Sequence, residues 1–182
     1  MNISARDGHA ALPARVIHVV QGEFAVSKDA DVVMSTVLGS CVAACLFDPL
    51  RGIGGINHFL LPNARGDHSD IRFAAAAMEQ LLNALLKKGA LKSDIRAKLF
   101  GGAKMIKTLP DIGRNNGLAA FEFLRNEEIP CLAESLGGTR ARRLRFFPNT
   151  GRAQIKFLGD DVPDPVVHAA LPEPRAGEAE LF

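Results

Sequence analysis

The chain has no tryptophan, no tyrosine and only three cysteines. It therefore lacks two of the side chains on which single-stranded nucleic acids stack. A small, odd number of cysteines is typical of reduced thiols and not of a disulfide framework. Every apolar run falls short of the roughly 18 residues that a transmembrane helix needs. The start, MNISARDGHAALPAR, has no apolar core like that of a signal peptide, so we expect a cytoplasmic protein without membrane insertion.

The composition is that of an ordinary folded domain. Of 182 residues, 47% are hydrophobic and 23% are charged, values that allow a sizeable core. The net charge of +2 does not by itself indicate a nucleic-acid partner. We expect one domain over residues 15–158, preceded by a flexible segment (1–14) and followed by a proline-containing mobile tail (159–182).

Hydrophobic periodicity predicts a mixed α/β fold. Apolar residues at helical spacing predict a helix over 70–88, capped by Ser69, and a second over 116–128, ended by Pro130. Turn residues between β-branched runs predict two hairpins, 42–47 with 53–61 and 142–147 with 152–158. Further strands are expected within 15–26, 31–36 and 97–100. We therefore expect mixed, largely antiparallel sheets flanked by helices, an α/β sandwich.

Cys41 and His58 are the residues best suited to act as a thiol nucleophile and its base. Cys41 follows Gly39-Ser40 in STVLGSCVAACLFDP, and His58 lies in GGINHFLLP on the next predicted strand. A turn over residues 48–51 would place Cys41 directly opposite His58, and a turn over 49–52 would make them diagonal neighbours on one face. A register between these two would separate them, because a one-residue shift exchanges the faces of a strand. The alternative interpretation is a small buried cysteine and a core histidine.

A metal site is not expected. Cys41 and Cys45 have C-x3-C spacing, but on a strand they would lie roughly 13 Å apart. The chain also has no second pair of Cys or His ligands at short spacing. We expect neither a metal nor another cofactor.

Four arginines, Arg140, Arg142, Arg143 and Arg145, cluster at the second hairpin. Strand alternation places Arg143 and Arg145 on one face and Arg142 on the other. Because the chain lacks tryptophan and tyrosine, we expect the cluster to dock an acidic protein helix by electrostatic attraction and not a nucleic acid.

Five stretches resemble the CheD family of bacterial chemotaxis proteins, the chemoreceptor glutamine deamidases. They are LGSCVAACLFDP (38–49), GGINHFLLP (54–62), FGGAKM (100–105), IGRNN (112–116) and GGTRARRLRFFPNTG (137–151). The resemblance implies an α/β fold like that of bacterial toxin deamidases and a hydrolase that converts receptor glutamines to glutamate. It implies chemoreceptor cytoplasmic domains as substrates and a CheC-type chemotaxis phosphatase as a partner. A non-catalytic adaptor that binds such a phosphatase or receptor is the alternative.

The resemblance also implies a role for each site residue. Cys41 corresponds to the nucleophile, His58 to the base, and the third member of the triad is a threonine before the cysteine. Ser35 has the family's spacing and Thr36 its residue type. The two would point to opposite faces of a strand, so the sequence leaves both open. The backbone at Gly39-Ser40 is expected to support the oxyanion, and an imidazolium to stabilise the Cys41 thiolate.

Overall fold

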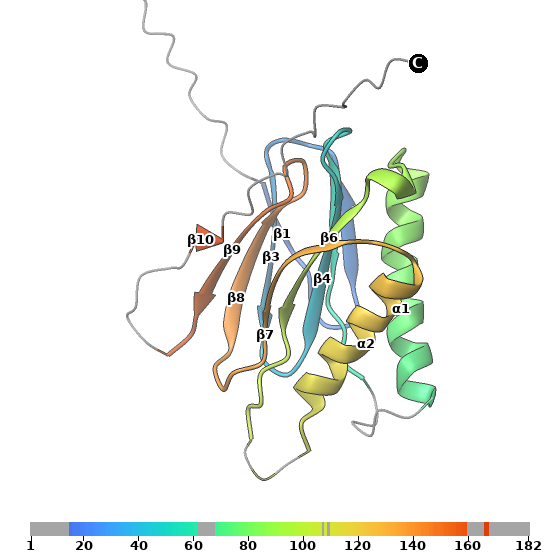
Figure 1. Cartoon of the computed structure of the whole chain (residues 1–182). Helices are drawn as coiled ribbons and strands as arrows, with labels where there is room; N and C mark the ends of the chain where they lie inside the picture. Colours follow the sequence, from blue (N-terminus) through green and yellow to red (C-terminus); the bar gives the residue numbers. More distant parts are fainter. Residues whose placement is uncertain (1–14, 62–67, 107, 109, 160–165, 168–182) are drawn as a thin grey trace, which may run out of the picture.

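The computed structural model describes residues 15–61, 68–106, 108, 110–159 and 166–167 (Figure 1). The predicted flexible segment, 1–14, lies outside these residues. So does the predicted mobile tail, apart from its first residue and one short strand, Val166–Val167. No helix in the described part of the chain is both long and apolar enough to cross a membrane.

The strands form two five-stranded sheets. The first sheet contains, in order, β1 (Arg15–His18), β3 (Val32–Leu38), β8 (Arg142–Phe147), β9 (Arg152–Phe157) and β10 (Val166–Val167). The second sheet contains, in order, β2 (Phe24–Ser27), β5 (Ile53–Asn57), β4 (Val42–Asp48), β6 (Arg96–Gly101) and β7 (Cys131–Leu136). Two neighbouring pairs, β1 with β3 and β6 with β7, are parallel, and the others are antiparallel. The prediction of mixed, largely antiparallel sheets is confirmed.

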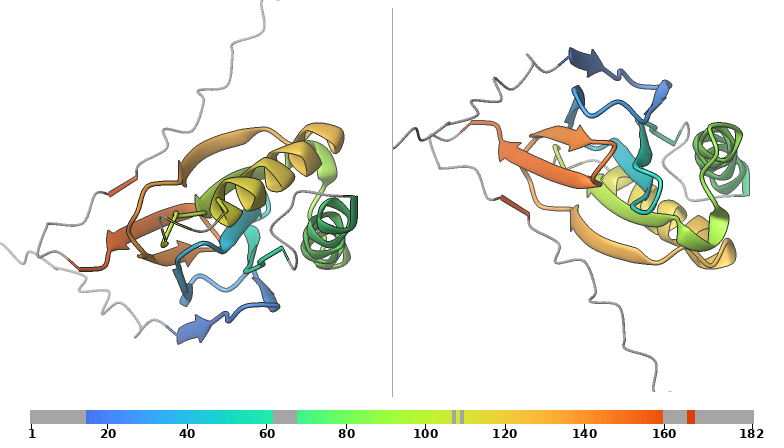
Figure 2. Two further views of the ribbon diagram at one scale, coloured as in Figure 1. Left: turned by 90° about the horizontal axis from the view of Figure 1, so that it is seen from below. Right: turned by 90° about the horizontal axis from the view of Figure 1, so that it is seen from above.

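The two sheets pack face to face, and both α-helices lie on the outer side of the second sheet (Figures 1 and 2). Alternate residues of β4 from Ala43 to Phe47 enter the core between the sheets. The other alternate residues, Val42, Ala44 and Leu46, point to the opposite face and pack against α1 (His68–Lys87) and α2 (Ile112–Asn126). Both faces of β4 are thus buried, which explains its nearly continuous apolar sequence. The helices flank only one sheet, so within the described chain no helix covers the outer face of the first sheet.

The helix boundaries differ from the predicted ones at the amino-terminal ends. α1 begins at His68, so Ser69 lies inside the helix and is not its cap. At the other end, the predicted stop at Gly89 is confirmed by its hydrogen bond to the Leu86 carbonyl, followed by one from Ala90 to Leu85. α2 begins at Ile112, four residues earlier than predicted. The side chain of Asp111 caps it by accepting a hydrogen bond from the Arg114 N–H at 3.0 Å. A short 3₁₀ turn, Lys92–Asp94, connects α1 to β6.

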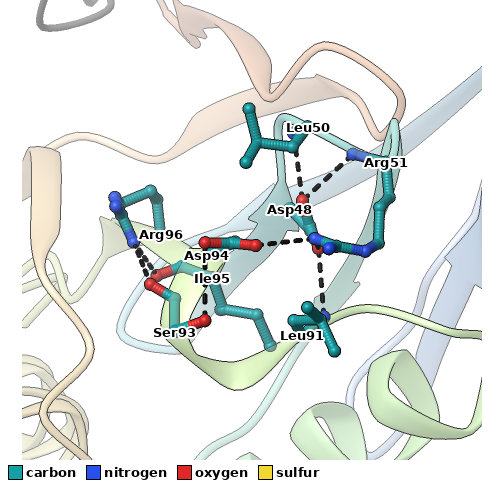
Figure 3. A network of polar contacts seen from close by, with 8 residues as sticks. All are labelled: Asp48, Leu50, Arg51, Leu91, Ser93, Asp94, Ile95 and Arg96. Carbon is teal, nitrogen blue, oxygen red and sulfur yellow. Dashed lines mark hydrogen bonds and ion pairs between the residues drawn. The ribbon is translucent and has the colours of Figure 1, made fainter. Parts of the chain in front are cut away.

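Asp48 sets the register of the β4–β5 hairpin (Figure 3). Its buried carboxylate accepts hydrogen bonds from the N–H groups of Leu50, Arg51 and Leu91 and from the guanidinium of Arg51, which also binds Asp94 at 2.7 Å. Asp48 consequently pairs with Ile53, so the turn covers residues 49–52. Of the registers considered from sequence, this is the one that makes Cys41 and His58 diagonal neighbours on one face.

β7 was not predicted. Its residues, CLAESL, are mostly half-buried, and they show no clear alternation of apolar and polar residues. The strand pairs in parallel with β6, so it is not preceded by a hairpin turn that would indicate it in the sequence.

Candidate active site

Cys41 lies in the short loop that carries the chain from β3 in the first sheet to β4 in the second. The backbone of the β6 end holds this loop: Ala103 donates to the Gly39 carbonyl and Gly102 to the Cys41 carbonyl, both at 2.8 Å. Gly101 has a φ of 108°, and a Cβ there would lie 2.2 Å from the Cys41 carbonyl oxygen. Only glycine therefore allows β6 to approach the loop this closely.

Asn116 is a second support of the loop, and the sequence analysis did not assign it a role. Its amide donates to the Ser40 carbonyl at 2.7 Å, and its oxygen accepts from the Leu61 N–H at 2.8 Å. The side chain is fully buried in α2. One residue thus joins the loop before Cys41 to the segment that follows His58. A polar residue on the buried face of a predicted helix was the signal that could have indicated it.

His58 follows directly after β5, on the same face of the hairpin as Cys41. The pair Val42 and Phe59 exchanges two backbone hydrogen bonds, at 3.0 and 2.9 Å, which continues the hairpin register up to the site. Cys41 and His58 flank this pair as diagonal neighbours, for which Cβ atoms typically lie roughly 7–8 Å apart or somewhat less. The side chain of His58 is buried.

Thr36, and not Ser35, makes the hydrogen bond to the imidazole of His58. The sequence had left both residues open as candidates for this contact. Its Oγ1 lies 2.8 Å from Nδ1 of His58, across the space between the two sheets. On β3, Met34 and Leu38 face the core between the sheets, and Thr36 shares their face. Ser35 alternates to the outer face of the first sheet, where it pairs with Arg145 of β8. Tertiary packing therefore selects the threonine.

Burial governs the protonation of both groups. It raises the pKa of Cys41 above its ordinary value of 9.0, partly opposed by the Cys41 backbone N–H. It lowers the pKa of His58 below 6.5, partly opposed by a backbone group of Val19. Both shifts favour the uncharged forms of the two groups at neutral pH, and the stabilisation of a Cys41 thiolate by an imidazolium stays a prediction. A neutral imidazole can accept the thiol proton when the sulfur attacks.

The second ring nitrogen of His58 is available for proton transfer. Nε2 is buried and has no hydrogen-bond partner among the described residues. If Nδ1–H donates to Thr36 Oγ1, Nε2 carries the free lone pair that a general base requires. A buried polar atom without a partner is costly in a folded protein and is commonly found at functional sites.

A cavity of about 670 Å³ lies over the outer face of the first sheet and reaches His58. Its walls come from β1 and the turn after it, from β3 and from β8, and include Thr36, His18 and Gln21. Gln21 connects the cavity to Cys41, because its side-chain oxygen accepts a hydrogen bond from the Cys41 thiol at 3.5 Å. His18 and Gln21 were not assigned to the site from sequence. His18 lies within an apolar run typical of an ordinary strand, and Gln21 follows that run directly.

The arginine cluster divides into separate roles. Arg143 and Arg145 are exposed and line the cavity. Arg142 is only 2% exposed; its guanidinium donates to the backbone and hydroxyl of Ser135 and to the Gly137 carbonyl. The prediction that Arg142 docks a partner is therefore wrong, since it holds the β7–β8 connection. The exposed Arg140 lies 4.7 Å over the ring of Phe157 and does not line this cavity.

The other two cysteines, Cys45 and Cys131, do not line the cavity that reaches His58. Cys45 is fully buried between the sheets, and burial raises its pKa far above the ordinary range. Burial also raises the pKa of Cys131, on β7 of the second sheet. In the described ranges, no group of three or more His, Cys, Asp or Glu side chains is placed to hold a metal ion.

A part-buried thiol, an imidazole on the same face and a hydroxyl that orients the imidazole form the arrangement used by cysteine-dependent acyl-transfer enzymes. Comparisons with known proteins identify the family. Residues 60–157 match the family model described as CheD chemotactic sensory transduction. The chain is 49% identical over 178 residues to a probable chemoreceptor glutamine deamidase CheD of Caulobacter sp. (strain K31), covering 93% of this chain and 94% of that one.

A similarly named protein of Agrobacterium fabrum is 44% identical over 177 residues, covering 93% of this chain and 97% of its relative. Among solved structures, the hypothetical protein YfiH of Bacillus licheniformis has a TM-score of 0.42 and 16% identity, covering 62% of this chain and 49% of that one. The sequence relatives span Cys41 and His58 as well as the segment matched by the family model. The chain belongs to the CheD family.

Proposed function

We propose that this chain is a chemoreceptor glutamine deamidase, in which Cys41 is the nucleophile, His58 the general base and Thr36 the residue that orients the imidazole. Its CheD relatives carry that activity in their names. The observation that carries the proposal is the 2.8 Å contact between Thr36 Oγ1 and His58 Nδ1. It orients a buried imidazole whose Nε2 is free, on the face of the hairpin that carries Cys41.

In the first half of the reaction, Nε2 of His58 takes the thiol proton while Sγ of Cys41 bonds to the carboxamide carbon of the substrate glutamine. The negative charge that develops on the amide oxygen is stabilised by backbone N–H groups of the Gly39-Ser40-Cys41 loop. The imidazolium then gives its proton to the amide nitrogen. The carbon–nitrogen bond breaks, ammonia leaves, and a thioester remains on Cys41.

In the second half, the neutral imidazole removes a proton from water, and the hydroxide oxygen bonds to the thioester carbon. The carbon–sulfur bond breaks, and the sulfur recovers its proton from His58. The net change is one amide and one water converted to glutamate and ammonium, because the ammonia that leaves takes up the proton that the new carboxyl group releases. Cys41 and His58 each return to their starting protonation state, so the reaction needs no cofactor.

The cavity supports receptor helices as substrates. Its arginines, Arg143 and Arg145, are placed to attract acidic side chains around a target glutamine. We assign the catalytic domain to residues 15–158 and place the protein in the cytoplasm, where the cytoplasmic domains of chemoreceptors are found. The family resemblance adds a CheC-type phosphatase as a proposed partner.

The test is intact-mass analysis of receptor cytoplasmic fragments incubated with the full chain. Deamidation adds about one dalton per converted glutamine. Cys41→Ala should abolish the mass shift, and His58→Ala should slow it by about 10²–10⁴-fold, the usual contribution of a general base. Because His58 is buried, its replacement could also destabilise the fold, so the unfolding curve of His58→Ala should be recorded together with its activity. Cys131→Ala is the matched cysteine control and should retain activity.

Peptide mapping after limited alkylation should show Cys45 as the slowest thiol, since it is fully buried. Blocking Cys41 should remove the activity. Full deamidation by Cys41→Ala would exclude the proposed nucleophile. Receptor binding by the wild-type chain without any mass shift would indicate a non-catalytic adaptor instead.

A further inference from the structure

The turn from Val20 to Glu23 carries Gln21 to the nucleophile. The Glu23 N–H donates to the Val20 carbonyl at 3.0 Å, which closes a four-residue turn. Gly22 has a φ of 88°, the positive value that the third position of a type II turn requires. Gln21 occupies the second position, where the side chain is free to project from the turn. Its placement therefore follows from a defined backbone geometry.

The same turn is built on the backbone of His58. Gly22 donates to the His58 carbonyl at 2.8 Å, and the His58 N–H donates to the Glu23 carbonyl at 3.0 Å. Just before the turn, the Val19 N–H donates to the Ser35 carbonyl at 3.0 Å. The residue that supplies the imidazole thus also anchors the segment that presents Gln21.

The carboxamide of Gln21 lies beside the sulfur that the proposed mechanism uses. Its Oε1 accepts the thiol hydrogen of Cys41 at 3.5 Å, and the residue lines the cavity that reaches His58. A substrate carbonyl attacked by Sγ must come within a few ångströms of this sulfur. The carboxamide of Gln21 is therefore within reach of the oxygen on which negative charge develops.

We propose that Gln21 is a second hydrogen-bond donor to the oxyanion. This inference rests on the roles of Cys41 and His58 in the proposed function. When substrate enters, the carboxamide turns about its Cγ–Cδ bond and presents Nε2–H₂ to the amide oxygen, opposite the backbone N–H of Cys41. As Sγ bonds to carbon, the electron pair of the C=O bond moves to that oxygen. Gln21 gives and takes no proton, so it donates equally well while the thioester forms and while it is hydrolysed.

A neutral amide suits this position. A lysine or arginine there would remain charged beside a buried imidazole and would oppose its protonation during the reaction. A carboxylate would repel the oxyanion and disfavour the thiolate. A glutamine supplies N–H groups without altering the charge of the site. While no substrate is bound, its oxygen accepts the hydrogen bond from the Cys41 thiol.

The test compares Gln21→Ala and Gln21→Glu with the wild-type chain on receptor cytoplasmic fragments. Both variants should lower kcat by about 10²–10³-fold with KM little changed, the usual loss for one oxyanion donor. Gln21→Glu is nearly isosteric, so a loss of kcat in this variant would exclude packing as the contribution. A similar loss in the uncharged Gln21→Ala would then assign the contribution to the N–H groups and not to the added charge. Gln80→Ala, an exposed glutamine on α1, is the matched control and should keep full activity.

Alkylation of Cys41 by iodoacetamide gives a readout that needs no oxyanion. Its rate should stay within a few-fold of wild type in Gln21→Ala, which would show that the thiol and the imidazole are still in place. A kcat of Gln21→Glu close to that of wild type would overturn the inference. So would a parallel fall in the alkylation rate, which would indicate a merely structural role.

Two further outcomes separate this inference from the proposed function. A normal Gln21→Ala beside an inactive Cys41→Ala would overturn the role of Gln21 alone, whereas an active Cys41→Ala would overturn both. Time-dependent conversion of Gln21 itself to glutamate in the wild-type chain, absent in Cys41→Ala, would make Gln21 a substrate of its own active site. That result would also exclude it as a donor.

Discussion

The hydroxyls of Ser35 and Thr36 are adjacent in sequence, yet they lie on opposite faces of β3, and only that of Thr36 contacts His58. The pair provides a matched experiment. Thr36→Val removes the hydroxyl at nearly constant volume and should lower kcat by about tenfold, since one hydrogen bond contributes roughly 1 kcal/mol or slightly more. Ser35→Ala should change kcat far less. Steady-state deamidation rates measured by mass spectrometry check this, and a larger loss for Ser35→Ala would reverse the assignment.

The shifted pKa values of Cys41 and His58 predict the pH dependence of the reaction. The base must be unprotonated, and burial lowers the pKa of His58, so activity should fall only below pH 6.5 as the imidazole gains a proton. The thiol must carry the proton that His58 accepts, and burial raises the pKa of Cys41 above 9.0. We therefore expect a broad plateau of kcat/KM between these limits. An acid limb centred above pH 7 would contradict a buried neutral imidazole.

At the scale of structural elements, the Asp48 turn is the feature on which the site depends. Its carboxylate is fully buried and accepts hydrogen bonds from Arg51, Leu50 and Leu91. Asp48→Asn keeps one acceptor oxygen but loses the charge and the second acceptor. We expect it to lower the free energy of unfolding by about 1.5–3 kcal/mol, the usual contribution of hydrogen bonds to a charged group. Urea unfolding at neutral pH measures this.

The same carboxylate makes the effect dependent on pH. Burial raises the pKa of Asp48, but the hydrogen bonds from Leu91 and Arg51 outweigh it and hold that pKa below 3.8. Its stabilisation is therefore complete above the unfolded-state pKa and is lost as the pH falls through the folded-state value. The difference between wild type and Asp48→Asn should shrink in acid. Asp29→Asn, in an exposed ion pair with Arg15, is the control and should change stability by about 1 kcal/mol or less.

Another element, α2, supports the site from the opposite side. Asn116 reaches from this helix to the loop before Cys41 and to the segment after His58. The early start of α2 at Ile112, capped by Asp111, places Asn116 in the second turn of the helix, facing the hairpin. The hairpin thus sets the face that the side chains of Cys41 and His58 share, and the helix holds the loop that carries the sulfur.

For the molecule as a whole, both helices lie on the second sheet, so among the described residues no helix covers the outer face of the first sheet, and we propose that a partner docks there. Val16 and Val37 on that face are 44% and 48% exposed, and Arg143 and Arg145 stand beside them at the cavity. Replacing both arginines by serine should raise KM for receptor fragments by up to about fivefold per residue while kcat stays nearly unchanged, because exposed charge pairs contribute up to about 1 kcal/mol each.

The effect should weaken as salt is added, since the Debye length is only about 8 Å at physiological ionic strength. Arg125→Ser, in the last turn of α2, removes one positive charge away from the cavity and is the control for each single arginine replacement. Steady-state kinetics at two salt concentrations distinguish the outcomes. A defect confined to kcat would place one arginine in the chemical step, and unaltered kinetics would exclude a docking role.

Much of the fold and part of the site were accessible from local sequence. Helical spacing identified the body of both helices, and Gly89 the end of the first. The alternation and turn residues of 42–61 identified the hairpin, and two of its three registers considered from sequence placed Cys41 and His58 near each other on one face. These features depend on residues close together in the chain, whose periodicity and turn preferences act without the rest of the molecule.

The remaining features required contacts between distant segments. The choice between Ser35 and Thr36 depended on the packing of β3 against a hairpin in the other sheet, which places Thr36 on His58. Gln21 reaches Cys41 only because its turn binds the backbone of His58. Arg142 resembles its exposed neighbours in sequence, but it is buried because the β7–β8 connection supplies carbonyl groups for it. Which residues meet across two packed sheets depends on how the sheets pair and stack. No local pattern encodes that arrangement, so these parts of the site followed from tertiary structure.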